Sequence, residues 1–94
     1  MKTPIVIFGK LEKNYCGMFF PPNVIVIDLT KDEDPARILI HEILHMCHPK
    51  TGEGKILMQE IKIWNSLSQY QRFMVYQFLF NRKYEETGVE RCRK

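Results

Sequence analysis

Residues 35–48 read PARILIHEILHMCH, and this stretch decides what the rest of the chain folds around. Acidic residues at 32–34 followed by Pro35 predict a helix start, because the helix dipole favours negative charge there and proline fits the first turn. Pro49 cannot continue the helix, so we expect it to run over 35–48. Apolar residues surround its middle, which predicts a central, buried helix.

Within that helix, His41, Glu42 and His45 form the pattern H-E-x-x-H. Two histidines four positions apart lie on one face of a helix, so both imidazoles can reach one Zn²⁺. Glu42 then stands where a general base would take a proton from a zinc-bound water. The pattern predicts one Zn²⁺ per chain, with His41 and His45 as ligands and Glu42 as the catalytic residue. The alternative is a pair of satisfied core histidines that bind no metal.

A catalytic zinc site needs a third protein ligand. We expect Glu60, which lies among apolar residues of a second helix returning beside the first, where an unpaired glutamate is costly. Glu53, in the turn between the helices, is the second choice, and a lysine ion pair is the metal-free alternative for Glu60. His48 lies about 10 Å along the axis from the first histidine and is expected to be a helix C-terminal residue. Cys47 points away from the metal face.

Short strands are expected before this helix and further helices after it. Runs rich in β-branched or aromatic residues occupy 5–8, 15–20 and 24–27. The second run is expected at a sheet edge, in a loose hairpin with the third, whose two apolar faces predict burial on both sides. Helical patterns cover 55–67 and 68–83. Three strands followed by three helices predict a single α+β domain over 1–94, with the helices on one side of a three-stranded sheet.

Composition and charge narrow the class of protein. Ninety-four residues suffice for one domain, and a 45% apolar content permits a core. The net charge of +3 lacks the clustered basic stripe of nucleic-acid-binding proteins. The apolar run at 5–8 is too short for a signal peptide or a membrane span, and three cysteines without a CxxC pair indicate a reducing compartment. We expect a cytoplasmic protein that binds neither nucleic acid nor membrane; the sequence does not indicate its oligomeric state.

The expected substrate is a peptide or protein in extended form. Such a chain can add to the edge of the strand predicted around 15–19 through main-chain hydrogen bonds. Gly17 would let a second backbone approach closely, although a bulge without a substrate role explains this glycine equally well. The small size of the domain predicts loose selectivity. Spacing does not choose the residue that donates a hydrogen bond to the oxyanion; the candidates are Tyr15, Tyr70, Tyr76, Tyr84 and His48.

The order of these features resembles the gluzincin clan of zinc metallopeptidases. Strands precede the motif His41-Glu42-x-x-His45 on a central helix, and a glutamate follows on the next helix. The short chain is similar to the minigluzincins, which are minimal single-domain zincins. The resemblance implies a zincin-like catalytic domain with His41, His45 and Glu60 as zinc ligands and Glu42 as general base.

The same resemblance implies a latent form, a zymogen, whose C-terminal segment occupies the cleft. Here that segment is 84–94, and Cys92 or Glu90 would take the fourth position on the zinc. Two alternatives remain open. The strands and motif helix also resemble the regulator-cleaving zincin domains of mobile elements, of the ImmA type. A zinc-stabilised binding or regulatory domain without turnover is the other, although such a site has no use for Glu42 as a base.

Overall fold

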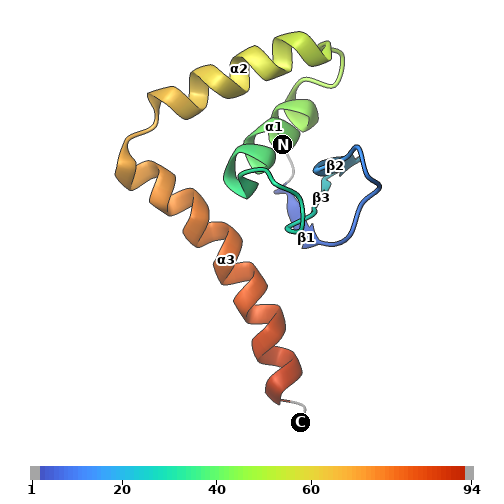
Figure 1. Cartoon of the computed structure of the whole chain (residues 1–94), viewed down its shortest axis with the longest axis vertical. Helices are drawn as coiled ribbons and strands as arrows, with labels where there is room; N and C mark the ends of the chain where they lie inside the picture. The colour runs from blue at the N-terminus through green and yellow to red at the C-terminus, as the bar shows by residue number, and fades with distance from the viewer. Residues whose placement is uncertain (1–2, 93–94) are drawn as a thin grey trace.

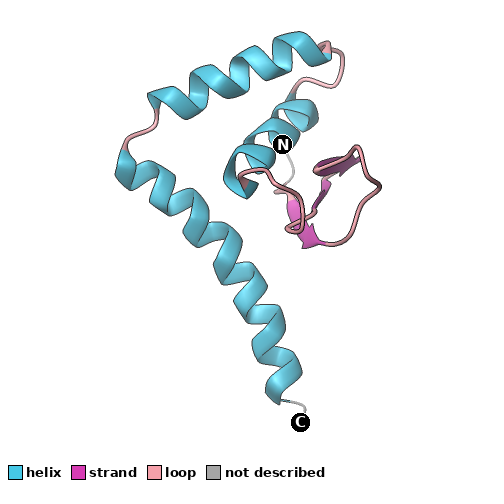
Figure 2. Cartoon of the chain, in the orientation of Figure 1, coloured by secondary structure: helices cyan, strands magenta, loops and turns pink. Residues whose placement is uncertain are grey.

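The computed structural model describes residues 3–92, with side chains described for residues 3–80. Within this range the chain forms three strands and then three helices (Figures 1 and 2). The elements are β1 (Ile5–Phe8), β2 (Gly17–Phe20), β3 (Val24–Ile27), α1 (Pro35–Cys47), α2 (Glu53–Ser66) and α3 (Gln69–Cys92). The predicted α+β order, a small sheet followed by three helices, is confirmed.

The sheet has the strand order β1-β3-β2, so β3 is central and β2 lies at an edge, as predicted. β2 runs antiparallel to β3, which confirms the expected hairpin. β1 runs parallel to β3, with Ile5 opposite Val24 and Phe8 opposite Ile27. Ile25 and Ile27 are fully buried, but the two valines of β3 are only partly so. The prediction of burial on both faces is therefore correct for one face of this strand.

The core lies between one face of the sheet and the helices. Val6, Ile25 and Ile27 pack in one buried cluster with Leu39 of α1 and Leu79 of α3. On the opposite face, the two isoleucines of β1 are 44% and 42% exposed. Among the described residues the helices thus cover one side of the sheet, which is the arrangement that the sequence predicts.

Local signals account for both ends of α1. Asp34 is the N-cap, its side chain accepts a hydrogen bond from the N–H of Ala36 at 2.9 Å, and Pro35 stands in the first turn. The helix ends one residue before the predicted end, with His48 as the C-cap. Tyr76 of α3 donates its hydroxyl to Asp34 at 2.5 Å. That contact holds the third helix against the start of the first.

The second and third helices differ in length from the predicted ones. α2 begins at Glu53, two residues before the expected start at 55, with Gly52 at the N-cap. At the start of α3, Ser68 and Gln71 form a reciprocal capping pair. The N–H of Ser68 donates to Gln71 Oε1 at 2.8 Å, and the N–H of Gln71 donates to Ser68 Oγ at 3.1 Å. This pair caps the N-terminal end of α3.

α3 continues beyond the predicted end at 83 as far as Cys92. Figure 1 shows the C-terminal end of this helix far from α1. The side chains of 84–94, including those of Glu90 and Cys92, lie outside the described residues, so their expected role as a plug stays a prediction. No helix in the described range is both long and apolar enough to cross a lipid bilayer.

A buried carboxylate fixes the loop between β1 and β2. Asp28 is 1% exposed and accepts hydrogen bonds from the N–H of Leu11 at 2.8 Å and from the N–H and hydroxyl of Thr30 at 2.9 and 2.5 Å. Lys31 lies 3.3 Å from Asp28 and donates to three carbonyl groups of the loop, that of Tyr15 among them. These bonds, the one from Leu11 foremost, hold the pKa of Asp28 below its usual range.

Candidate metal centre

A cleft of about 660 Å³ lies between the edge strand and the first two helices. Its walls bring together the parts of the chain that the sequence analysis singled out: the H-E-x-x-H helix, the glutamates of the next helix and the glycine-containing strand. The lining includes Arg37, Ile38, His41, Glu42 and His45 from α1, Glu53, Leu57 and Glu60 from α2, and residues 14–19. The candidate site residues from these separate segments therefore line one cleft.

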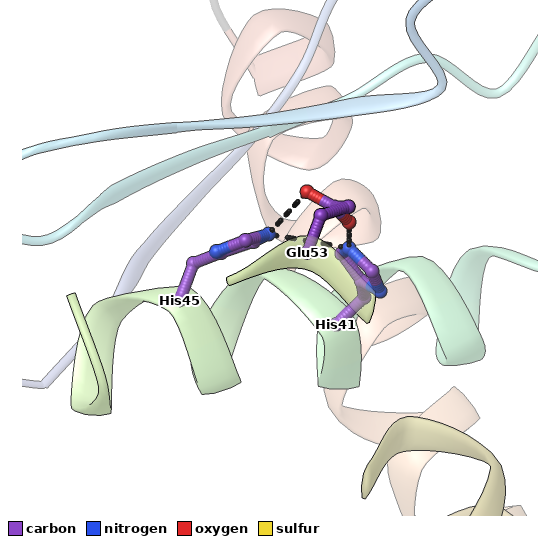
Figure 3. A group of neighbouring side chains, drawn as sticks. All are labelled: His41, His45 and Glu53. Carbon is purple, nitrogen blue, oxygen red and sulfur yellow. Dashed lines mark hydrogen bonds and ion pairs between the residues drawn. The ribbon is translucent and has the colours of Figure 1, made fainter. Parts of the chain in front are cut away.

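Three side chains converge at the mouth of this cleft. Figure 3 shows the imidazoles of His41 and His45 rising from α1 toward the carboxylate of Glu53. The two Nε2 atoms are 3.2 Å apart. Glu53 bridges them, because its Oε2 is 3.1 Å from His45 Nε2 and its Oε1 contacts His41 Nε2. One ligand atom from each residue lies within 4.8 Å of the others.

This geometry fits a zinc ion. With zinc–nitrogen bonds of about 2.0–2.1 Å and tetrahedral angles, two ligating nitrogens stand about 3.3 Å apart. The observed separation of His41 Nε2 and His45 Nε2, 3.2 Å, is close to that value. Two nitrogens and one carboxylate oxygen also form a donor set of catalytic zinc sites, which keep a fourth position open. Without a cation or a shared proton, two imidazole lone pairs facing each other at this distance would repel.

Glu60, the ligand expected first, lies on the other side of His41. Its Oε1 is 2.9 Å from His41 Nδ1, and its Oε2 is 2.8 and 2.6 Å from two nitrogens of Arg37. Both oxygens are thus engaged away from His45. The structure brings Glu53, the second choice, to the two Nε2 atoms instead. The expectation that Glu60 faces inward is confirmed, since it is 6% exposed.

The early start of α2 explains this exchange of positions. Glu53 occupies the first turn of the helix rather than a separate loop. Glu53 and Glu60 are seven residues apart and so share one helix face, two turns from each other. The more N-terminal glutamate reaches the Nε2 side of the histidines, and the other reaches the Nδ1 side. The seven-residue spacing is the signal that would have placed both glutamates on the same face of the second helix from the sequence.

Glu42 lines the cleft and is buried, with 8% exposure. Burial raises its pKa, and Glu53 adds to this, whereas His41 and His45 act in the opposite direction. A Cβ placed on Gly17 would lie 3.5 Å from the Oε2 of Glu42, so the carboxylate stands beside the edge strand. Glu42 therefore lines the same cleft as the histidine pair, next to that strand.

Gly17 has a structural role that differs from both sequence interpretations. A Cβ at this position would overlap Ile38 Cγ2 and lie 3.3 Å from Glu42 Cγ, so only glycine lets α1 approach the strand this closely. Gly17 also pairs regularly with Ile27, which excludes a bulge at this residue. The absence of a side chain lets the helix pack against this face of β2, and the approach of a substrate backbone at the strand edge stays a prediction.

The outer edge of β2 carries backbone groups directed away from β3. Asp28 N–H donates to the carbonyl of Cys16 at 2.9 Å, which makes these two residues a hydrogen-bonded pair. Such pairs alternate along antiparallel strands, so the N–H and C=O groups of Gly17 and Phe19 point toward the open edge. Both residues line the cleft.

Of the candidate oxyanion donors, Tyr15 lines the cleft and is 47% exposed. Tyr76 instead donates its hydroxyl to Asp34, and Tyr70 lies on α3, 70% exposed. His48 caps α1, and the side chain of Tyr84 lies outside the described residues. Cys47 is exposed and does not belong to the histidine–glutamate group.

Comparison of the chain with models of protein families, with curated proteins and with solved structures finds no match. The proposal of a function therefore rests on the geometry of the cleft.

Proposed function

We propose that this chain is a zinc-dependent metallopeptidase in which His41, His45 and Glu53 hold the metal and Glu42 is the general base. The observation that carries the proposal is the convergence of two Nε2 atoms, 3.2 Å apart, and a carboxylate at the mouth of a cleft. A bound zinc ion would supply a Lewis acid that polarises a peptide carbonyl and acidifies water.

Glu42 has the environment that a general base requires. Its pKa is raised by burial, which brings its proton affinity closer to that needed near neutral pH. Glu42 takes a proton from the attacking water and passes it to the leaving amine nitrogen. Tyr15 is our choice for the donor to the oxyanion, because it is the candidate hydroxyl that borders the cleft among the described side chains.

We propose an extended peptide as the substrate. Its backbone would pair with the free N–H and C=O groups of Gly17 and Phe19, as an added strand beside β2. Pairing through main-chain atoms reads little of the side-chain sequence, so loose selectivity follows. Three cysteines without a CxxC pair support the expected cytoplasmic setting. Whether the chain is a latent zymogen stays a prediction.

The test separates metal binding from turnover. Purified chain is assayed for zinc content by mass spectrometry and for cleavage of a denatured protein, both before and after truncation beyond Tyr84. We expect one zinc per chain in wild type, loss of zinc in Glu53→Gln, and retained zinc with cleavage reduced about 10²–10⁴-fold in Glu42→Gln. Glu33→Gln, on an exposed glutamate of the same cleft, is the matched control. Wild-type cleavage by Glu42→Gln would refute the catalytic role.

A zinc-stabilised domain without turnover is the second candidate, favoured by the small size of the domain. Such a site is normally closed by four protein ligands, whereas the group found among the described residues supplies three. Full zinc occupancy with background cleavage in both full-length and truncated chains would favour this candidate. Cleavage confined to a regulator protein would instead favour the ImmA-like setting.

A further inference from the structure

Charged groups lie behind His41, on the side away from His45. Glu60 contacts His41 Nδ1 through one oxygen, at 2.9 Å, and Arg37 through the other, at 2.8 Å to Nε and 2.6 Å to Nη2. The side chain of Glu60 is 8% exposed, and that of Arg37 is 39% exposed. Arg37 therefore supplies, from the cleft side, the counter-charge that a buried carboxylate needs.

The contact with Glu60 favours a proton on Nδ1 of His41. In a neutral imidazole one nitrogen donates and the other accepts, and an ionised carboxylate only accepts. Glu60 thus favours the tautomer with the proton on Nδ1. In the metal-free chain the carboxylate of Glu53 contacts Nε2 and favours a proton on that nitrogen instead. With a metal bound between the histidines and Glu53, Nε2 would present its lone pair to the metal, and Glu60 would hold the proton on Nδ1.

Two helices are needed for this arrangement. Arg37 and His41 are four residues apart on α1 and so share one face, while Glu60 reaches both from the middle of α2. Because the guanidinium holds one carboxylate oxygen through two N–H groups, the other oxygen is directed at the imidazole. The contact fixes the plane of the His41 ring and favours the proton on Nδ1.

We propose that Arg37 and Glu60 form a clamp that positions His41 for metal binding, with Arg37 acting through Glu60. The identity of the metal rests on the proposed function. The orientation of His41 does not, because it is a property of the metal-free chain. In this assignment neither clamp residue ligates the metal, and Glu60 has a positioning role.

The first experiment measures the His41 tautomer directly, in metal-free full-length chain, by ¹⁵N NMR of the histidine rings at pH 9, where an ordinary imidazole is neutral. The measurement is made in Glu53→Gln, which removes the carboxylate that favours a proton on Nε2. We expect the Nδ1–H tautomer in Glu53→Gln and a shift toward Nε2–H when Glu60→Met is added. The control is Lys62→Met, which removes a charge from the exposed face of α2 and should leave the tautomer unchanged. An Nδ1–H tautomer retained in Glu53→Gln/Glu60→Met would overturn the clamp.

The second experiment measures zinc affinity by competition with a chelator. Residues that orient a metal-bound histidine typically change affinity 10–100-fold when replaced. We expect losses of affinity in this range for Arg37→Met and Glu60→Met, and a smaller loss for Arg37→Lys. Lys62→Met should keep the wild-type affinity, and Glu53→Gln should lose more affinity than either clamp variant. Wild-type affinity in Arg37→Met, or a loss in Glu60→Met as large as that in Glu53→Gln, would overturn the assignment.

Two further outcomes are separable. If Arg37→Met does not fold, because Glu60 is left buried without its partner, the double variant Arg37→Met/Glu60→Met replaces the ion pair with apolar groups. It should show the same affinity loss and, when added to Glu53→Gln, the same tautomer shift, and no change in either measurement would overturn the clamp. If the wild type binds no zinc, the proposed function fails, and the tautomer measurement alone decides whether the clamp exists.

Discussion

Gly17→Ala should destabilise the fold by bringing a methyl group into the contact between β2 and α1. The added Cβ would overlap Ile38 Cγ2 and stand 3.3 Å from Glu42 Cγ. Both neighbours belong to a helix packed against the sheet, so relief requires the helix or the strand to shift. Inserting a methyl group into a packed contact typically costs about 1–3 kcal/mol.

Gly9→Ala is the matched control for that substitution. A Cβ there would meet Val26 Cγ1 at 3.5 Å, an ordinary contact, and none of the described glycines has a positive φ. Replacing glycine also lowers the entropy of the unfolded chain, which stabilises both variants by about 0.4–1 kcal/mol. The difference between the two variants isolates the overlap. We expect Gly17→Ala to unfold at the lower temperature, by about 4–8 °C for each kcal/mol.

A double-mutant cycle tests the cause. Ile38→Ala removes the overlapping Cγ2 and should cost about 2–5 kcal/mol alone. In Gly17→Ala/Ile38→Ala the new methyl group occupies vacated space, so the two costs should sum to more than the measured loss. Equal stability of Gly17→Ala and Gly9→Ala, or strict additivity in the cycle, would refute the packing argument.

Two predictions concern pH. Hydrogen bonds from Leu11 and Thr30 lower the pKa of Asp28, so its contribution to stability is present above about pH 4 and is lost as the pH falls below that value. Asp28→Asn should be less stable at pH 6 and lose less on acidification to pH 3; parallel melting profiles would contradict this. Burial and the bond to Asp34 raise the pKa of Tyr76 to about 12, so its contribution is present below about pH 10 and is lost between pH 10 and 12. The difference in unfolding free energy between wild type and Tyr76→Phe should decrease as the pH rises from 10 to 12. A difference that stays constant would exclude the titration of Tyr76 as a source of stability.

Local patterns predict most of the secondary structure of this chain. The runs at 5–8 and 24–27 are strands with the predicted bounds, and Pro35 begins α1, because β-branched runs and capping signals act within a few residues. The parallel pairing of β1 with β3 was not predicted, since it joins segments that no local pattern connects. The predicted start of α2 was two residues too late, because Gly52 and Gly54 on either side of Glu53 are typical of a turn.

The site was predictable to the extent that it follows one helix. His41, Glu42 and His45 lie together in the cleft because their spacing on α1 places them there. Which glutamate faces which ring nitrogen depends on how α2 lies against α1, and the sequence of either helix alone does not fix that. Arg37 illustrates the same limit, since its partner Glu60 is 23 residues away and on another helix.

α2 depends on the site for its place in the fold. In the part of the chain described, its buried residues are Ile56 and Glu60, and one of these two belongs to the clamp. Glu53 joins the N-terminal end of α2 to α1 through the histidines, so a bound metal links the two helices at a second point. Zinc at 100 times its dissociation constant would stabilise the folded state by about 2.7 kcal/mol. We expect zinc to slow amide hydrogen exchange in α2 more than in β1, as measured by mass spectrometry. Equal protection in both elements would mean that the metal does not dock this helix.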